Sequence, residues 1–378
     1  ISLWIELTMN KIKVLQMGKF YPPSFGGIEQ VVYDITKGIN SLSSKYCCDV
    51  LCFNHDTRKG SKTDYSDGAE IYRMNTIGVI SSAPISLMYF FKFIKIKGEY
   101  DIIHLHAPNP IATIAALFAR NKKIIIHWHS DIVKQKRLLK LFLPVQKQML
   151  NRASKIIVTS DNYGRCSEQL FGFERKIMTI PIGIPSDKTL TPKEYVPKNK
   201  KIIFSLGRLI YYKGFEYLIE AAKYLPENYM VIIGGTGSLY SELQKKIDDN
   251  RLNNKVRLVG RIPMEELQSY YESADLFCMP SIEKSEAFGV VQLEAMKHGV
   301  PVVSTRIPGS GVSWVNLNGV SGLTVPVKNS QALSEAFINI LENESLYKHL
   351  SNGALRRYNE NFTSDKMCRK IIELYDEL

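Results

Sequence analysis

The sequence of 378 residues lacks any long, uninterrupted hydrophobic run. A membrane-spanning helix needs at least about 18 mostly apolar residues, and the longest candidate, over 83–93, already contains Lys92. Cysteine is also sparse: the six residues include no Cys-x-x-Cys pair and no His/Cys cluster at zinc spacing. We therefore expect no transmembrane helix, no disulfide framework and no zinc site, and we expect buried thiols in a reducing compartment.

The composition is that of an ordinary globular protein, with 45% hydrophobic and 23% charged residues. Disordered, fibrous and coiled-coil chains are thereby excluded, and the length is sufficient for two domains. Residues 1–8 precede a Met-Asn-Lys sequence and fit no element, so we expect them to be a leader outside the fold.

The net charge of +12 is concentrated in the first half, where residues 1–189 carry 26 Lys and Arg against 15 Asp and Glu. The densest part, over 133–155, has no acidic residue and interleaves its basic residues with leucines. A basic helix with a bulky apolar face can lie on an anionic membrane, and a helix packed on a sheet with a solvated charged face explains the pattern equally well. Residues 86–97 repeat the theme more weakly. No zinc finger, aromatic single-strand motif or helix-turn-helix supports a nucleic-acid partner.

Short β-branched runs alternate with amphipathic stretches, which is typical of parallel sheets with crossover helices. In the first half the predicted strands are 12–17, 48–53, 102–106, 123–127 and 155–159, and the predicted helices are 28–39, 111–120, 138–150 and 163–170. In the second half the predicted strands are 202–206, 229–233, 256–259, 275–279 and 300–304, with helix from about residue 331.

The proline-containing stretch after Pro181 can continue neither a helix nor a central strand, which predicts an interdomain linker over 186–200. The predicted domains are 9–185 and 201–357, with a C-terminal helix over 358–378 that could pack back on the first domain. Ligands of open α/β sheets bind at the carboxyl ends of the strands, so loops that follow strands are the candidate sites.

The first such loop, Gly-Lys-Phe-Tyr-Pro-Pro-Ser-Phe-Gly-Gly over 18–27, lies between a strand and a helix. Gly26 and Gly27 let a ligand approach the backbone closely, and the free N–H groups at the helix start attract phosphate or sugar oxygens. A structural turn would use the same residues, so both interpretations stay open.

The second loop is Ser-Leu-Gly-Arg-Leu-Ile-Tyr-Tyr-Lys-Gly-Phe over 205–215. Arg208 and Lys213 place two cations beside a turn, where they could hold a diphosphate, the arginine as a planar fork and the lysine as a point charge. Such cations also stabilise the charge that develops on a departing nucleoside diphosphate. Ordinary surface charges are the alternative, and Gly207 and Gly214 favour the ligand site.

The third string, over 280–296, is Pro-Ser-Ile-Glu-Lys-Ser-Glu-Ala-Phe-Gly-Val-Val-Gln-Leu-Glu-Ala-Met. We predict Glu286 in the loop after a strand and Glu294 two turns into the next helix. A loop carboxylate can accept hydrogen bonds from sugar hydroxyls, and the later one can pair with a ribose diol. Acidic residues near a helix start can also simply favour its dipole, and Glu283 competes with Glu286 for the loop role.

Together these strings resemble the family-4 retaining glycosyltransferases, over essentially the whole chain from Met9. The most specific parts are Gly-Arg-Leu…Lys-Gly over 207–214 and Glu-x-Phe-Gly…Leu-Glu-Ala-Met over 286–296. The resemblance implies an α/β protein of GT-B fold, with two Rossmann-like parallel-sheet domains facing across a cleft. It also implies that the second domain binds a nucleotide sugar.

By this resemblance Arg208 and Lys213 hold the diphosphate, Glu286 the donor sugar and Glu294 the ribose. His129 lies in Ile-His-Trp-His-Ser-Asp over 126–131, which matches the family's loop facing the transferred sugar, and we interpret His127 as the inward-facing residue of the strand. The implied catalytic residues are Arg208, Lys213, Glu286 and His129. The implied donor-binding residues are Gly26, Gly27, Gly207, Arg261, Ile262, Phe288, Gly289, Val290 and Glu294. The predicted acceptor and membrane side comprises Asp131, Lys134, Lys136, Arg137 and Lys140.

The resemblance also implies that the acceptor hydroxyl attacks on the face that the diphosphate leaves, so that the anomeric configuration is kept. The sequence places no carboxylate pair in the manner of a glycosidase and has no Asp-x-Asp metal motif. We therefore expect no cofactor and no divalent cation in the chemistry.

The chain looks most like bacterial enzymes that assemble O-antigen repeat units on undecaprenyl-diphosphate acceptors at the cytoplasmic face of the cell membrane. We favour a UDP-N-acetylhexosamine donor, UDP-N-acetylgalactosamine first, with GDP-mannose as the alternative. The expected partners are the nucleotide sugar, a lipid-linked glycan and an anionic membrane surface, without nucleic acid. A nucleotide-sugar epimerase and an inactive sugar-binding protein remain alternatives from other classes.

Overall fold

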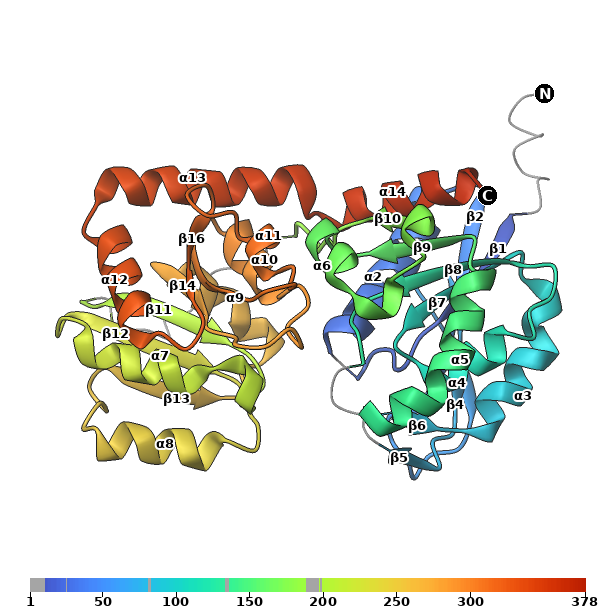
Figure 1. Ribbon diagram of the computed structural model, residues 1–378, viewed down its shortest axis with the longest axis horizontal. Coiled ribbons are helices and arrows are strands. Elements are labelled where there is room, and N and C mark those ends of the chain that lie inside the picture. The colour runs from blue at the N-terminus through green and yellow to red at the C-terminus, as the bar shows by residue number, and fades with distance from the viewer. Residues whose placement is uncertain (1–10, 25, 81–82, 133–135, 188–196, 198) are drawn as a thin grey trace. The chain divides into compact units, whose positions relative to one another are not determined.

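The computed structural model describes residues 11–24, 26–80, 83–132, 136–187, 197 and 199–378 (Figure 1). The chain divides into two compact units, one of Ile1–Pro185 with Ser364–Leu378 and the other of Ser186–Thr363. Each unit contains its own sheet of mainly parallel strands with crossover helices, which confirms the predicted α/β class with two Rossmann-like domains. The predicted leader over 1–8 and most of the predicted linker over 186–200 lie outside the described residues.

The first unit is built on an eight-stranded sheet of order β10-β9-β8-β7-β1-β2-β4-β3. Its strands are β1 (Ile12–Met17), β2 (Tyr46–Phe53), β3 (Lys62–Ser66), β4 (Ala69–Met74), β7 (Ile102–Ala107), β8 (Lys123–Trp128), β9 (Lys155–Val158) and β10 (Ile177–Thr179), and β5 (Gly78–Ile80) and β6 (Ala83–Ile85) form a separate hairpin. Only β3, at one edge, pairs antiparallel. The strand prediction missed it because its Lys-Thr-Asp-Tyr-Ser sequence is polar and largely exposed.

Helices cover both faces of this sheet, as buried parallel strands require. They are α2 (Gly27–Leu42), α3 (Leu87–Ile96), α4 (Pro110–Ala116), α5 (Lys136–Arg152), α6 (Asp161–Cys166) and α14 (Ser364–Asp376). The last helix packs closely against α2, since a methyl group on Gly38 would come within 2.4 Å of Cys368 Sγ. Helix α4 contacts both α3 and α5. Right-handed crossovers place these three helices on the face of the sheet opposite α2 and α14.

The second unit has a six-stranded parallel sheet of order β13-β12-β11-β14-β15-β16. Its strands are β11 (Lys201–Leu206), β12 (Tyr229–Gly234), β13 (Val256–Gly260), β14 (Leu276–Met279), β15 (Val302–Arg306) and β16 (Gly322–Pro326). This is the doubly wound order, in which the order of the strands reverses between β11 and β14. Ligands of such sheets bind at the carboxyl ends of the strands beside this switch point.

The helices of the second unit are α7 (Phe215–Ala221), α8 (Tyr240–Asp249), α9 (Met264–Glu272), α10 (Val291–Lys297), α11 (Val312–Val315), α12 (Ser330–Leu341) and α13 (Glu344–Asn361). Helix α13 runs past the predicted domain end at residue 357, so the predicted start of the C-terminal helix at residue 358 is wrong. The helix begins at Ser364 and belongs to the first unit, as expected. The chain instead breaks between α13 and α14, and the second unit ends at Thr363.

Two further expectations concern cysteines and membrane spans. Four cysteines are buried, but Cys47 is only partly buried and Cys166 is exposed, so the expectation of uniformly buried thiols is wrong. No helix in the described part of the chain combines the length and apolarity that a membrane span requires.

Candidate functional site

The loops that follow β11 and β14 meet at the switch point of the second unit. The backbone N–H of Ile282 donates to the carbonyl of Tyr212 over 2.8 Å. Gly214 adopts a left-handed conformation with φ of +68°, and a Cβ there would lie 2.1 Å from the carbonyl oxygen of Pro280. Only glycine therefore allows this close approach of the two loops, which brings the side chains of one loop to those of the other.

An ion pair joins the two loops. Lys213 Nζ lies 2.5 Å from Glu286 Oε2, and the two side chains are only 13% and 11% exposed. Ser281 Oγ donates to the same carboxylate oxygen over 3.0 Å, and the carbonyl of Glu286 accepts a hydrogen bond from Ser310. The structure thus pairs Lys213 with Glu286, whereas Glu283 accepts the backbone N–H of Glu286 through its carbonyl.

Arg208 belongs to the same group of side chains. It is exposed, and its Nη2 donates to Tyr212 Oη over 3.4 Å, while Lys213 Nζ lies 5.6 Å from the centre of the Tyr212 ring. The two predicted cations therefore both contact Tyr212, and Lys213 links them to the predicted carboxylate of Glu286. Such a group can bind an anion through the cations and polar hydroxyls through the carboxylate.

The structure corrects the predicted position of Glu294. Because α10 begins at Val291, Glu294 lies in the first turn of the helix rather than two turns in. Burial raises the pKa of the Glu294 carboxyl above its ordinary value, partly offset by the nearby ammonium of Lys297. A largely buried carboxylate with a raised pKa in the first turn of a helix is a candidate for a binding site.

The residues just before α10 have different surroundings. Gly289 has φ of +78°, and a Cβ there would lie 2.5 Å from Met279 Cε. Val290 caps the helix. The ring of Phe288 is 3% exposed and packs against Trp314 and Phe362. Its side chain therefore stabilises the loop, and its backbone is the part left for a donor.

The remaining donor-binding candidates of this unit lie at neighbouring strand ends. Gly207 N–H donates to the Gly234 carbonyl over 3.0 Å, and a Cβ on Gly207 would contact the Lys213 side chain. Arg261 is exposed and Ile262 partly so, just after β13. Their side chains are thus accessible.

In the first unit, Gly26 and Gly27 lie after β1, at the start of α2. Gly26 is the N-cap in extended conformation, with no side-chain cap hydrogen bond, and the space where a Gly27 Cβ would lie is open to 4 Å. Asn109 Nδ2 donates to the Gly18 carbonyl over 3.1 Å, which ties this loop to the end of β7. The loop therefore offers accessible backbone at the switch point of the first sheet, between β1 and β7.

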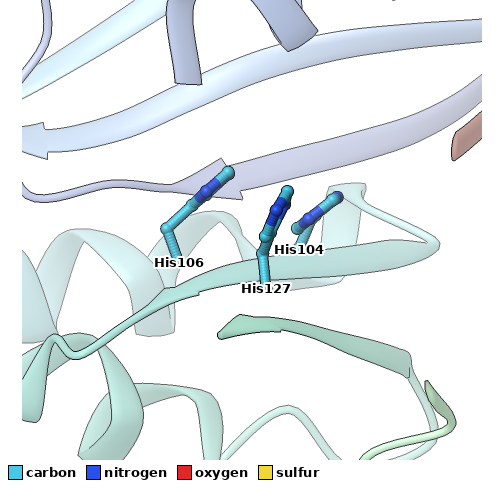
Figure 2. A group of neighbouring side chains, drawn as sticks. All are labelled: His104, His106 and His127. Carbon is cyan, nitrogen blue, oxygen red and sulfur yellow. The ribbon is translucent and has the colours of Figure 1, made fainter. Parts of the chain in front are cut away.

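Four histidines, His104 and His106 of β7 and His127 and His129 at the end of β8, form one buried stack. Successive ring centres lie 4.3 to 5.5 Å apart, and the exposed fractions are at most 5%. Figure 2 shows the side chains of His104, His106 and His127 on the same side of the sheet. Burial lowers the pKa of His104 and of His129 to about 3, and the pKa values of His106 and His127 lie well below the ordinary value for the same reason.

The interpretation of His127 alone as inward-facing is therefore wrong. Residues two apart on a strand share a face, so His129 follows His127 into the same buried stack. Four further residues of this hydrogen-bonded group were not predicted: His104, His106, Gln16 and Tyr375. The alternation His104-Leu-His106 on a predicted strand was the signal that could have indicated them.

The predicted acceptor and membrane side is described only in part. Lys134 and the side chains of Lys136 and Arg137 lie outside the described residues, and Lys140 is exposed on α5. Asp131 accepts hydrogen bonds from Trp128 Nε1 over 3.0 Å and from Ser167 Oγ over 2.6 Å. Its carboxylate therefore holds the loop after β8.

Two Rossmann-like domains, the second with paired cationic and acidic loops at its switch point, define the GT-B class of glycosyltransferases. Family models match the two halves: "Glycosyltransferase Family 4" over 25–188 and "Glycosyl transferases group 1" over 186–357. The chain belongs to this family of glycosyltransferases.

Two relatives match nearly the whole chain. The chain is 34% identical over 376 residues to the O-antigen chain mannosyltransferase C of Escherichia coli, covering 97% of this chain and 99% of that protein. It is 30% identical over 361 residues to the D-rhamnosyltransferase WbpZ of Pseudomonas aeruginosa, covering 93% of each.

Solved structures share the fold. HepE of Anabaena, in complex with UDP and glucose, matches with a TM-score of 0.75 at 20% identity, covering 97% of this chain and 100% of that chain. A sucrose-phosphate synthase of Thermosynechococcus elongatus matches with a TM-score of 0.77 at 20% identity, covering 97% and 99%.

Proposed function

We propose that this protein transfers a sugar, with retention of anomeric configuration, from a nucleotide donor to a lipid-linked saccharide in O-antigen assembly. The observation that carries the proposal is the contact of Lys213 with Glu286, beside Arg208, at the switch point of the second sheet. The similarity to an O-antigen mannosyltransferase supports the biosynthetic setting.

Each residue has a role that its chemistry allows. Arg208 and Lys213 bind the donor diphosphate and stabilise the charge that develops as it leaves, so the reaction needs no divalent cation. When Lys213 turns to the diphosphate, Glu286 Oε2 loses its cationic partner and can accept hydrogen bonds from the sugar hydroxyls. Glu294 binds the ribose diol. The diphosphate itself accepts the proton of the acceptor hydroxyl.

For the donor, the names of the relatives favour the GDP-mannose alternative over UDP-N-acetylgalactosamine. One relative is a mannosyltransferase and the other a rhamnosyltransferase, and rhamnose is a 6-deoxy sugar of mannose configuration. We therefore propose a mannose-configured donor sugar carried by GDP, and the UDP-N-acetylhexosamines serve as competing donors in the test.

An exposed apolar surface in the first unit supports a membrane-bound acceptor. On α3, Leu87 and Phe91 are 63% and 57% exposed, and Phe118, just after the end of α4, is 48% exposed. The two helices are in contact, with the rings of Phe90 and Phe118 5.3 Å apart. The exposed Lys95 lies on α3. A surface of bulky apolar and basic side chains suits the headgroup region of an anionic cytoplasmic leaflet.

The direct test offers the purified protein GDP-mannose, UDP-N-acetylgalactosamine and UDP-N-acetylglucosamine, with an undecaprenyl-diphosphate saccharide as acceptor and EDTA present. We expect mannosyl transfer and an axial product linkage by NMR. Arg208→Ala should lower turnover at least about 100-fold, whereas the exposed Arg356→Ala should leave it unchanged. Transfer that requires added Mg²⁺, or full activity of Arg208→Ala, would contradict the diphosphate role. Release of a free epimer without acceptor would instead identify an epimerase.

Flotation with anionic vesicles tests the membrane surface. We expect the protein to float with the vesicles at low salt and the double variant Leu87→Ser/Phe91→Ser to float much less. Phe171→Ser is a matched control, because Phe171 is 83% exposed in the same unit but lies outside α3 and α4. Absence of binding at low salt would remove this part of the proposal.

A further inference from the structure

A chain of hydrogen bonds connects His129 to the C-terminal helix α14. His129 Nε2 lies 2.9 Å from His106 Nδ1, and His106 Nε2 lies 2.8 Å from Gln16 Oε1. Gln16 Nε2 in turn donates to Tyr375 Oη over 3.2 Å, and Tyr375 Oη lies 2.6 Å from His104 Nδ1. Gln16, His106 and His104 are at most 2% exposed and Tyr375 is 3% exposed, so water has little access to the chain.

The glutamine fixes the direction of every bond in the chain. Its amide nitrogen donates to Tyr375 and also faces Cys48 Sγ at 3.7 Å, so its oxygen is the acceptor toward His106. His106 Nε2 must then carry the proton, which leaves Nδ1 as an acceptor because a neutral imidazole has one of each. His129 Nε2 is therefore the donor to His106, and His129 Nδ1 carries a lone pair.

His129 is one end of this hydrogen-bond chain. His129 Nδ1 is buried without a hydrogen-bond partner, and an acceptor left unsatisfied in this way costs free energy. A ligand hydroxyl that donates to this atom would remove the cost. His129 can therefore accept one hydrogen bond at Nδ1.

We propose that Gln16 and Tyr375 are positioning residues that hold His129 in the Nε2–H tautomer, so that its Nδ1 accepts a hydrogen bond from a hydroxyl of the donor sugar. The inference rests on the proposed function and on the expectation, drawn from the family resemblance, that the loop of His129 faces the transferred sugar. Through the hydroxyl of Tyr375, α14 would then help to orient His129, although the helix lies more than 230 residues from His129 in the sequence.

A metal ion is the competing occupant of the cluster. The ligand atoms of His104, His106 and His127 all lie within 4.8 Å of one another, and both ring nitrogens of His127 lack a hydrogen-bond partner. Both nitrogens of His106, however, are already hydrogen bonded. A metal would have to displace Gln16 or His129, and the geometry therefore favours the hydrogen-bond chain.

The test uses the full-length protein with ¹⁵N-labelled histidine. NMR shifts of the ring nitrogens report which nitrogen of each histidine is protonated, and the His129→Asn spectrum assigns the His129 signals. Two variants disrupt the chain: Gln16→Leu removes the acceptor for His106, and Tyr375→Phe removes the acceptor that orients Gln16. Tyr46→Phe is the matched control, because Tyr46 Oη also binds α14, at Asp376 over 2.8 Å, outside the chain.

We expect wild-type His129 to be the Nε2–H tautomer and both chain variants to shift it toward Nδ1–H. Both variants should lower kcat about tenfold or more, the usual scale for losing a group that orients a functional histidine. The KM for the nucleotide sugar should change less than about twofold, because Arg208 and Lys213, which bind the diphosphate, lie outside the hydrogen-bond chain. Tyr46→Phe should change neither the tautomer nor kcat.

Four outcomes would overturn the proposal. They are an Nδ1–H tautomer in the wild type, a tautomer shift without loss of kcat, an equal loss of kcat in Tyr46→Phe, and Zn²⁺ binding that His127→Ala abolishes. If no donor is transferred at all, the proposed function fails, and the tautomer spectra still decide whether the chain exists as described.

Discussion

The pairing of Lys213 with Glu286 makes a prediction that can be tested without any substrate. Replacing Glu286 by Gln leaves the Lys213 ammonium without a counter-charge, and replacing Lys213 by Met leaves the Glu286 carboxylate with Ser281 alone. The double variant removes both charges together. A double-mutant cycle on unfolding therefore isolates the interaction of the two side chains.

The expected size follows from the burial of the pair. Breaking a fully buried pair by removing one partner costs about 3–5 kcal/mol, whereas an exposed pair contributes about 0–1 kcal/mol. Because both side chains are nearly nine-tenths buried, we expect each single variant to lose about 2–3 kcal/mol. The double variant should lose less than the sum by at least about 1 kcal/mol.

Urea unfolding followed by circular dichroism is the appropriate assay, because urea is uncharged and does not screen the pair. The control is Lys245→Met, which breaks the pair of Lys245 with Asp249. That pair is equally short, at 2.6 Å, but its side chains are 74% and 59% exposed, so the loss should stay below about 0.5 kcal/mol. Single variants that lose no more than this control, with additive effects, would refute a buried contact between the two loops.

Two further predictions concern pH. Burial raises the pKa of the Glu294 carboxyl in the folded protein, so the ionised residue costs stability once the pH rises above the ordinary pKa near 4.5. Glu294→Gln should therefore raise the free energy of unfolding at pH 7 and leave it unchanged at pH 4. The same variant should weaken nucleotide binding, measured by calorimetry. Burial lowers the pKa values of the four stacked histidines, so the first unit should lose stability as the pH falls below about 6.5 toward 3. Hydrogen exchange should show the backbone amides of β7 and β8 losing protection in this range. Undiminished protection of those amides at pH 4 would contradict the neutral stack.

The sequence predicted those parts of the fold that are locally periodic. The strands of both sheet centres were found within a few residues, because buried parallel strands are continuous apolar runs. Towards the sheet edges, β3, β4, β10 and β16 were missed. The sequences of β3 and β16 carry too little apolar periodicity to differ from loops. The break between α13, which ends at Asn361, and α14, which begins at Ser364, was also missed.

Some residues of the candidate site were predictable from the sequence and others were not. Arg208, Lys213 and Glu286 were recognisable because each follows a strand in a glycine-containing string, and the switch-point topology brings such loops together. Gln16 and Tyr375 could not be found, because they are 359 residues apart and ordinary core residues in their own segments. Their pairing depends on α14 packing against α2, which the local sequence does not specify.

The two switch points differ in their electrostatics, and this difference bears on the proposed reaction. In the second unit the strand ends present charged groups, two cations and two carboxylates. In the first unit the ends of β7 and β8 present a stack of imidazoles that burial keeps neutral. A diphosphate needs the cations, whereas a sugar that carries no charge needs acceptors that neither repel nor protonate. A protonated His129 could donate a hydrogen bond but could no longer accept one at Nδ1. Under the proposal that His129 accepts a hydrogen bond from a sugar hydroxyl, the stack must stay neutral, and its deep burial, which costs stability in acid, keeps it so.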